Sequence, residues 1–124
     1  MILGVGFDLV DVGELQSEVD AKREEWLNRT FTATEREYCG RQADPYRCFA
    51  GAFAAKEGAL KALGTGWTDE SDLRDVQVDH KHDRPVISLS GSLLEASQKI
   101  GVRSLFVSIS HTKHYAAAVV VLEG

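Results

Sequence analysis

The feature that most constrains this chain is a long helical pattern that runs from Asp44 to Gly64. Asp44-Pro45 is typical of a helix start, because Asp caps an N-terminus and Pro suits the first helical position. Gly64 is well placed to end the helix, since glycine adopts positive φ without strain. Large apolar side chains recur along one side of the pattern: Phe49, Phe53, Leu60 and Leu63. The pattern therefore predicts a helix that is largely buried.

The chain before this helix predicts one strand and two further helices. The apolar run MILGVGFDLV favours a strand over residues 2–8, and apolar residues at helical spacing follow over residues 12–27. Thr32 and Glu35 have the spacing of a capping box, which predicts a short helix that begins near residue 33.

The chain after the helix changes to the alternation of extended strands. A hairpin is expected over residues 76–89, with HKHDRP as its turn, and a helix over residues 91–100 after Ser90 as N-cap. Two more strands are expected at residues 105–109 and 115–122, with a turn between them from His111 to His114. The predicted fold is α+β, an antiparallel sheet packed against helices in one domain over residues 1–124.

Composition excludes several classes of protein. With 124 residues and a formal charge of −5, the chain suits one acidic domain, and an acidic surface argues against nucleic acid as the main partner. No apolar run approaches the ~20 residues that span a bilayer, so no membrane association is expected. The N-terminus lacks a basic region before its apolar run, so we expect a cytosolic protein. In that compartment Cys39 and Cys48 are expected as reduced thiols.

Asp8 interrupts the apolar run near the N-terminus. Gly4-Val5-Gly6 precedes it, but the third glycine of the dinucleotide-binding pattern is absent, so these glycines favour close approach of another backbone. A carboxylate in such a run is costly to bury unless it is paired or binds a metal. The alternative for Asp8 is the N-cap of the next helix.

Glu57 and Lys61 stand one turn apart on the central helix. An exposed i, i+4 ion pair is the default explanation of this spacing. Against it, small alanines flank the pair and leave room for a ligand, and Gly64-Thr65-Gly66 follows with backbone N–H groups that can face an anion. Lys61 is a compact cation of the kind that binds phosphate.

The histidines alone indicate no metal or nucleophile site. His111 lies at a predicted strand end beside Thr112, without the surroundings that a serine–histidine pair needs. His80 and His82 are expected as exposed hairpin residues, because a pair without further ligands is a weak metal site.

Taken together, three stretches resemble the holo-(acyl carrier protein) synthase family, the small bacterial class of 4′-phosphopantetheinyl transferases. They are GVGFDLVDV, FAGAFAAKEGALKALGTG and SISHTKHYAAAVVV, in that order, and the resemblance extends from Ile2 to Glu123. The family transfers the 4′-phosphopantetheine arm of coenzyme A to a serine of apo acyl carrier protein, requires Mg²⁺ and releases adenosine 3′,5′-bisphosphate. Such activity serves fatty acid or polyketide biosynthesis.

The resemblance also implies roles for individual residues. Asp8 and Glu57 would be the metal-binding carboxylates, with Glu57 as the candidate catalytic base. Lys61 would be the second catalytic residue and would contact the pyrophosphate. Further coenzyme A contacts are implied for Gly64, Thr65, Gly66, Pro85, His111 and Thr112. Members of this length form homotrimers with active sites at subunit boundaries.

Three positions depart from what the resemblance leads us to expect. Ala52 stands where relatives carry an arginine that holds a coenzyme A phosphate, so Arg47 or Arg41 would have to replace it. Glu14 stands where relatives place a basic residue that meets the acidic carrier protein. Asp83 stands where relatives commonly have a turn glycine, and little harm is expected because Asp tolerates the left-handed conformation. These departures leave open a different carrier or a non-catalytic trimeric homologue that binds coenzyme A or a carrier.

Overall fold

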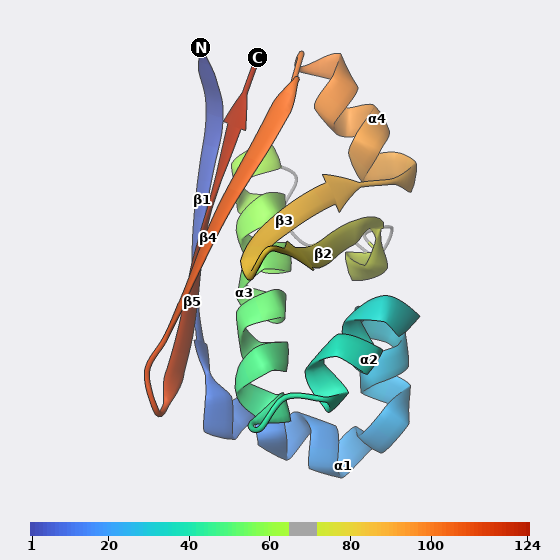
Figure 1. Ribbon diagram of the computed structural model, residues 1–124. Helices are drawn as coiled ribbons and strands as arrows, with labels where there is room; N and C mark the ends of the chain where they lie inside the picture. The colour runs from blue at the N-terminus through green and yellow to red at the C-terminus, as the bar shows by residue number, and fades with distance from the viewer. Residues whose placement is uncertain (65–71) are drawn as a thin grey trace.

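In the computed structural model, which describes residues 1–64 and 72–124, an antiparallel sheet lies against one side of a central helix (Figure 1). The strands are β1 (Ile2–Asp11), β2 (Val76–Lys81), β3 (Arg84–Leu89), β4 (Ser104–His111) and β5 (Tyr115–Glu123). The helices are α1 (Val12–Thr30), α2 (Ala33–Gly40), α3 (Pro45–Leu63), the short 3₁₀ turn η1 (Leu73–Asp75) and α4 (Gly91–Lys99). The predicted α+β class, with an antiparallel sheet packed against helices, is confirmed.

The central helix α3 begins and ends where the sequence predicts. The Asp44 side chain accepts a hydrogen bond from the Arg47 N–H at 3.2 Å, and Pro45 is the first helical residue. Gly64 ends the helix in the left-handed conformation, with φ of 74°. The sheet packs against one side of α3, and the β2–β3 hairpin and α2 lie on its other side (Figure 1). The helix therefore contacts the three-stranded sheet on one side and the hairpin and α2 on the other.

Among the described residues, a three-stranded antiparallel sheet has the order β1-β5-β4, and β2 and β3 form a separate hairpin. Two glycines of β1 lie directly against α3. A Cβ atom added at Gly6 would lie 1.8 Å from the Gly58 carbonyl oxygen, and one at Gly4 would lie 2.1 Å from that of Ala62. The structural explanation of the Gly4-Val5-Gly6 pattern, close approach of another backbone, is confirmed.

The β2–β3 hairpin turns through His82 and Asp83, which have φ of 51° and 61°. Lys81 pairs with Arg84 across this two-residue turn. Positive φ at both central residues is the geometry that matches the twist of a hairpin, and Asp accepts it at low cost. The departure at Asp83 therefore leaves the hairpin intact, as expected.

A buried ion pair joins α2, α3 and the start of β2. Lys56 is fully buried, and its Nζ atom lies 2.8 Å from Oε1 of Glu35 and donates to the carbonyl oxygens of Leu73 and Val76. Glu35 also accepts from the N–H of Thr32 at 2.8 Å, which completes the predicted capping box. Burial lowers the pKa of Lys56, and the Glu35 carboxylate opposes this shift. Both charges are thus paired within the core.

The structure decides two local predictions near the strand and helix ends. Asp8 lies inside β1, opposite Ala118 of β5, because the strand continues to Asp11. The N-cap of α1 is Asp11, whose carboxylate accepts from the N–H of Glu14 at 3.0 Å, so the N-cap alternative for Asp8 is excluded. Ser90 is the N-cap residue of α4, as predicted, although its hydroxyl donates to Asp75 and makes no capping hydrogen bond.

The two cysteines form a disulfide, which corrects the expectation of reduced thiols. Cys39, in the last turn of α2, and Cys48, in the first turn of α3, lie with their Cα atoms 5.4 Å apart. The expectation came from the compartment alone, and the sequence did not show that the turn between the two helices brings these side chains together. Within the described residues, no helix has the length and apolar character needed to cross a membrane.

Candidate active site

The strand–helix pocket, between β1, α1 and α3, contains Asp8, Glu57 and Lys61 in its lining. The Lys61 Nζ atom lies 2.9 Å from Oδ1 of Asp8 and 3.2 Å from the carbonyl oxygen of Phe7. The Lys61 side chain is 54% exposed and that of Asp8 is 16% exposed. The three predicted residues thus line one pocket. The default explanation was an ion pair between Glu57 and Lys61 on the helix surface, but Lys61 also pairs with Asp8 of β1.

The glycine contact between strand and helix explains why the charged groups meet. Gly6 lies against Gly58 with no room for a side chain on the strand. Because strand side chains alternate, Asp8 points to the same face of the sheet as Gly6 and therefore toward α3. Glu57 and Lys61 share one face of α3, since residues four apart are neighbours on a helix. The backbone approach thus sets the two carboxylates and the lysine into one space.

The strand–helix pocket is strongly acidic. Its described lining has five carboxylates against one lysine: Asp8, Asp11, Glu14, Glu18, Glu57 and Lys61. No cluster of three or more His, Cys, Asp or Glu side chains with metal-site geometry occurs among the described residues. This donor set does not fit a metal held by protein ligands alone. It does fit Mg²⁺, which commonly takes one or two carboxylates and completes its shell with water and substrate oxygens.

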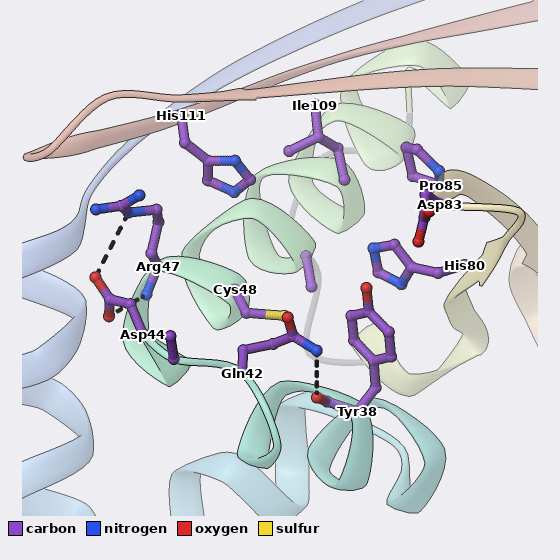
Figure 2. Close-up of a pocket in the computed structure, with 12 residues that line it drawn as sticks. Tyr38, Gln42, Asp44, Arg47, Cys48, His80, Asp83, Pro85, Ile109 and His111 are labelled. Atoms are coloured by element: carbon purple, nitrogen blue, oxygen red, sulfur yellow. Dashed lines mark hydrogen bonds and ion pairs between the residues drawn. The ribbon is translucent and has the colours of Figure 1, made fainter.

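A second pocket, the hairpin pocket, lies on the other side of α3 between α2, the β2–β3 hairpin and β4 (Figure 2). Pro85 and His111, both predicted to contact coenzyme A, line it. Ala52 and Arg47 also line it, so an arginine is present although the expected position holds alanine. Arg41 pairs with Glu37 on α2 and is not part of the described lining. Of the two replacements considered, Arg47 is the one at the pocket.

His111 presents its imidazole to the start of α3. Its Nε2 atom would lie 2.6 Å from a Cβ atom added at Gly51, so the ring rests where the helix has no side chain. Burial of the ring and, next, the nearby Arg47 guanidinium lower the pKa of His111 below its ordinary value of 6.5. A phosphate in this pocket would meet the Arg47 guanidinium, which is paired with Asp44 in the free protein, and an imidazole that can gain positive charge.

Sequence reasoning missed an aromatic stack in the hairpin pocket. The rings of Tyr38 and His80 are 4.0 Å apart and nearly parallel, at 8°. His80 is half-buried, and burial lowers its pKa. The expectation that His80 is an exposed hairpin residue is therefore wrong, whereas His82 is exposed. No local signal links Tyr38 to His80, because they come from a helix and a strand far apart in the chain.

The remaining predicted contacts are less closely associated with either pocket. Thr112 holds the β4–β5 turn, where its hydroxyl accepts a hydrogen bond from the N–H of Tyr115 at 3.1 Å, and it adjoins His111. Gly64 ends α3 one turn after Lys61. Thr65 and Gly66 lie outside the described residues.

The predicted site residues fall into two groups on different faces of α3. Glu57 and Lys61 face the strand–helix pocket, whereas Cys48 and Ala52 face the hairpin pocket, and no described residue lines both. Within a single copy of the chain, Asp8 and Glu57 therefore lie in a different pocket from His111.

Comparisons with known proteins identify relatives over the whole chain. The family model described as the 4′-phosphopantetheinyl transferase superfamily matches residues 4–120. A holo-[acyl-carrier-protein] synthase of Syntrophus aciditrophicus is 40% identical, over 100% of this chain and 98% of its own length. The crystal structure of the Helicobacter pylori holo-[acyl-carrier-protein] synthase in complex with coenzyme A is 30% identical. It superposes with a TM-score of 0.84, over 96% of this chain and 99% of that one. The synthase of Neisseria meningitidis reaches a TM-score of 0.90 at 26% identity, with both chains fully covered.

Proposed function

Because this chain belongs to the 4′-phosphopantetheinyl transferase superfamily, we propose that it modifies an apo acyl carrier protein. In this reaction it transfers the 4′-phosphopantetheine group of coenzyme A to a carrier serine and releases adenosine 3′,5′-bisphosphate. The observation that carries the proposal is the convergence of Asp8, Glu57 and Lys61 on the strand–helix pocket. The modified carrier would serve fatty acid or polyketide biosynthesis.

The proposed chemistry assigns a proton and a charge to two residues of α3. The serine oxygen forms a bond to the phosphorus that bears the pantetheine arm, and the P–O bond to the departing adenosine bisphosphate breaks. Glu57 accepts the serine proton, and Lys61 stabilises the negative charge on the leaving group. Both side chains lie on one helical face, so an acceptor serine and the diphosphate can be held side by side.

We also propose that Asp8 and Glu57 hold Mg²⁺, which the acidic lining of the strand–helix pocket supports. Bound there, the ion would supply positive charge opposite the diphosphate. The Lys61 ammonium beside Asp8 neutralises one carboxylate of the pocket in the free protein. Arrival of an anion would draw Lys61 toward the diphosphate and leave the Asp8 oxygen for a cation.

The hairpin pocket is the proposed binding site for the nucleotide end of coenzyme A. His111 and Arg47 would meet its phosphates and Pro85 its adenine, since all three residues line the pocket. In the free protein the Arg47 guanidinium lies beside the Asp44 carboxylate, with Nε 3.5 Å from Oδ2, so it would turn toward a bound phosphate (Figure 2). Phosphate contacts from Thr112 and Gly64 are proposed from the family resemblance alone, since neither residue lines the hairpin pocket. Arg47 takes the part of the arginine that is absent at Ala52.

We propose that the site is completed in a homotrimer. The outer face of the sheet, away from α3, carries large apolar side chains that are more than half exposed: Val5, Phe7, Leu9 and Phe106. Such a continuous apolar face is typical of a surface that another chain covers. Association would also bring the strand–helix pocket of one copy next to the hairpin pocket of another, which would unite the two groups of site residues. The count of three rests on the family resemblance.

The proposed function is tested by incubation of the protein with coenzyme A, Mg²⁺ and an apo acyl carrier protein. Mass spectrometry of the carrier should show the added phosphopantetheine, and Glu57→Gln should reduce the rate by about 10²–10⁴-fold. Glu95→Gln, an exposed change on α4, is the matched control and should retain full activity. A carrier that remains unmodified by the wild-type protein, while coenzyme A still binds, would favour the non-catalytic homologue.

A further inference from the structure

The disulfide between Cys39 and Cys48 closes a small ring that contains part of the hairpin pocket. The two cysteines are nine positions apart. Several pocket-lining residues lie within the ring: Gln42, Ala43, Asp44 and Arg47. Cys48 lines the pocket as well, whereas Cys39 is only 2% exposed. One covalent bond therefore fixes the ends of the segment that forms one wall of the pocket. Figure 2 shows Gln42, Asp44, Arg47 and Cys48 of this wall.

The hydrogen bonds of the turn that joins α2 to α3 are local. Within the described part of the chain, the hydrogen bonds of residues 41–44 all run to partners between Glu37 and Cys48. Examples are the Gln42 side chain on the carbonyl oxygen of Tyr38, at 3.2 Å, and the Asp44 carboxylate on the N–H of Arg47. These bonds close the turn on itself. The disulfide ties the end of α2 to the start of α3 across this turn, in addition to the buried Lys56–Glu35 pair that joins the same two helices.

We infer that Cys39 and Cys48 are a thiol–disulfide redox centre whose state sets the affinity of the hairpin pocket for its nucleotide ligand. This inference rests on the proposed function, because that function makes the pocket a coenzyme A site. The bond is open to thiol–disulfide exchange, because Cys48 lines the pocket, where a small thiol can reach it. The position of the bond, in the pocket wall, gives its reduction a direct effect on binding.

The exchange chemistry enters from the pocket side. A low-molecular-weight thiolate attacks the Cys48 sulfur, which faces the pocket, and the buried Cys39 leaves as a thiolate. A second thiolate attacks the mixed disulfide at its outer sulfur and frees Cys48. Two thiols are oxidised to one small disulfide, and the protein disulfide is reduced to two thiols. The reverse reaction with a small disulfide restores the bond.

Reduction should weaken ligand binding by increasing the freedom of the pocket wall. Without the bond, the turn over residues 41–44, which includes Gln42, Ala43 and Asp44 of the pocket wall, samples more conformations, and binding must order it again. Immobilising one or two side chains costs about 1.4 kcal/mol of binding free energy, so the reduced protein should bind the nucleotide about tenfold more weakly. The ligand should in turn stabilise the disulfide form, since coupling between two equilibria is reciprocal.

The test uses adenosine 3′,5′-bisphosphate as the probe, because coenzyme A itself carries a thiol and would disturb the redox state. Calorimetry on the full-length protein after treatment with oxidised glutathione, and again after a phosphine reductant, should give dissociation constants that differ by about tenfold. Mass spectrometry with thiol alkylation measures the state of the cysteines in each sample. The double variant Cys39→Ser/Cys48→Ser should bind like the reduced protein under both conditions.

Three results would overturn the inference. Equal affinities of the two redox forms would remove the switch but leave the proposed function intact. Alkylation of both cysteines after treatment with oxidised glutathione would show that the bond does not form. Absence of probe binding in both forms would contradict the assignment of the pocket, and with it both this inference and the proposed coenzyme A site.

Discussion

The Nζ atom of Lys61 lies 2.9 Å from Oδ1 of Asp8, although 53 positions of sequence separate the two residues. The pair joins the face of α3 that carries Glu57 to the strand β1. It keeps one cation among the carboxylates of the strand–helix pocket, at the place where a diphosphate and its divalent cation are proposed to bind. Substrate binding would replace this internal pair with a cation on Asp8 and an anion on Lys61.

Replacement of Lys61 with alanine should weaken coenzyme A binding by about 10- to 100-fold, because a charge-assisted hydrogen bond to the diphosphate is lost. Calorimetry at fixed Mg²⁺ concentration measures this change. Lys99→Ala, which removes an exposed lysine from the last turn of α4, should have no effect. Unchanged affinity of the Lys61 variant would leave its pair with Asp8 as a purely structural contact.

Replacement of Glu14 with arginine should lower the KM for an acidic carrier protein. Glu14 is exposed in the first turn of α1 and lines the strand–helix pocket, so it repels a negatively charged partner that approaches the site. The effect should be largest at low salt, where screening is weakest. Glu95→Arg makes the same change of charge on α4, at the far end of the molecule (Figure 1), and should leave KM unchanged. Equal KM values for Glu14→Arg and wild type at low ionic strength would argue against a carrier path over α1.

Replacement of Lys56 with methionine should destabilise the fold by about 3–5 kcal/mol, because the buried Glu35 carboxylate loses its ionic partner. Urea denaturation measures the free energy of unfolding. The double variant Lys56→Met/Glu35→Gln removes both charges and should recover part of the loss. A single-variant cost below about 1 kcal/mol would mean that the pair contributes far less than a typical buried pair.

Coenzyme A affinity should increase as pH falls through the range in which the imidazole of His111 gains a proton. The pKa of His111 is below 6.5 in the free protein, and a bound phosphate favours the imidazolium form, so binding takes up a proton. The affinity should therefore increase as pH falls below the bound-state pKa and level off below the free-state pKa. His111→Gln should flatten this profile, whereas His114→Gln, in the exposed β4–β5 turn, should not. Parallel profiles for wild type and His111→Gln would exclude His111 as the phosphate contact.

Local signals predicted much of the fold. The Thr32–Glu35 capping box, the Asp44 N-cap and the Gly64 terminator act through hydrogen bonds or dihedral angles within a few residues, so the sequence alone specifies them. The hairpin at His82-Asp83 is another case, because its turn geometry depends on those two residues. Caps and tight turns of this kind are specified by neighbouring residues and can therefore be predicted from sequence.

Contacts between distant segments were not predictable in the same way. The Tyr38–His80 stack and the Cys39–Cys48 disulfide depend on how α2 sits against β2 and α3, which no local pattern reports. No local pattern distinguishes Lys56 from other helix lysines, and only the packing shows that it is fully buried. The same limit led the sequence to offer Asp8 as a helix cap, since the extra residues of β1 depend on pairing with β5.

The central claim is that the carboxylates of one subunit and the histidine of another form one transfer site, and a mixing experiment tests it most directly. Glu57→Gln and His111→Ala should each be nearly inactive alone in phosphopantetheine transfer. After the two variants are unfolded and refolded together in equal amounts, random assembly should restore intact sites at about a quarter of subunit boundaries, and activity in proportion. If the mixture is no more active than either variant alone, while each alone forms the same oligomer as the wild type, the two residues do not belong to a shared site.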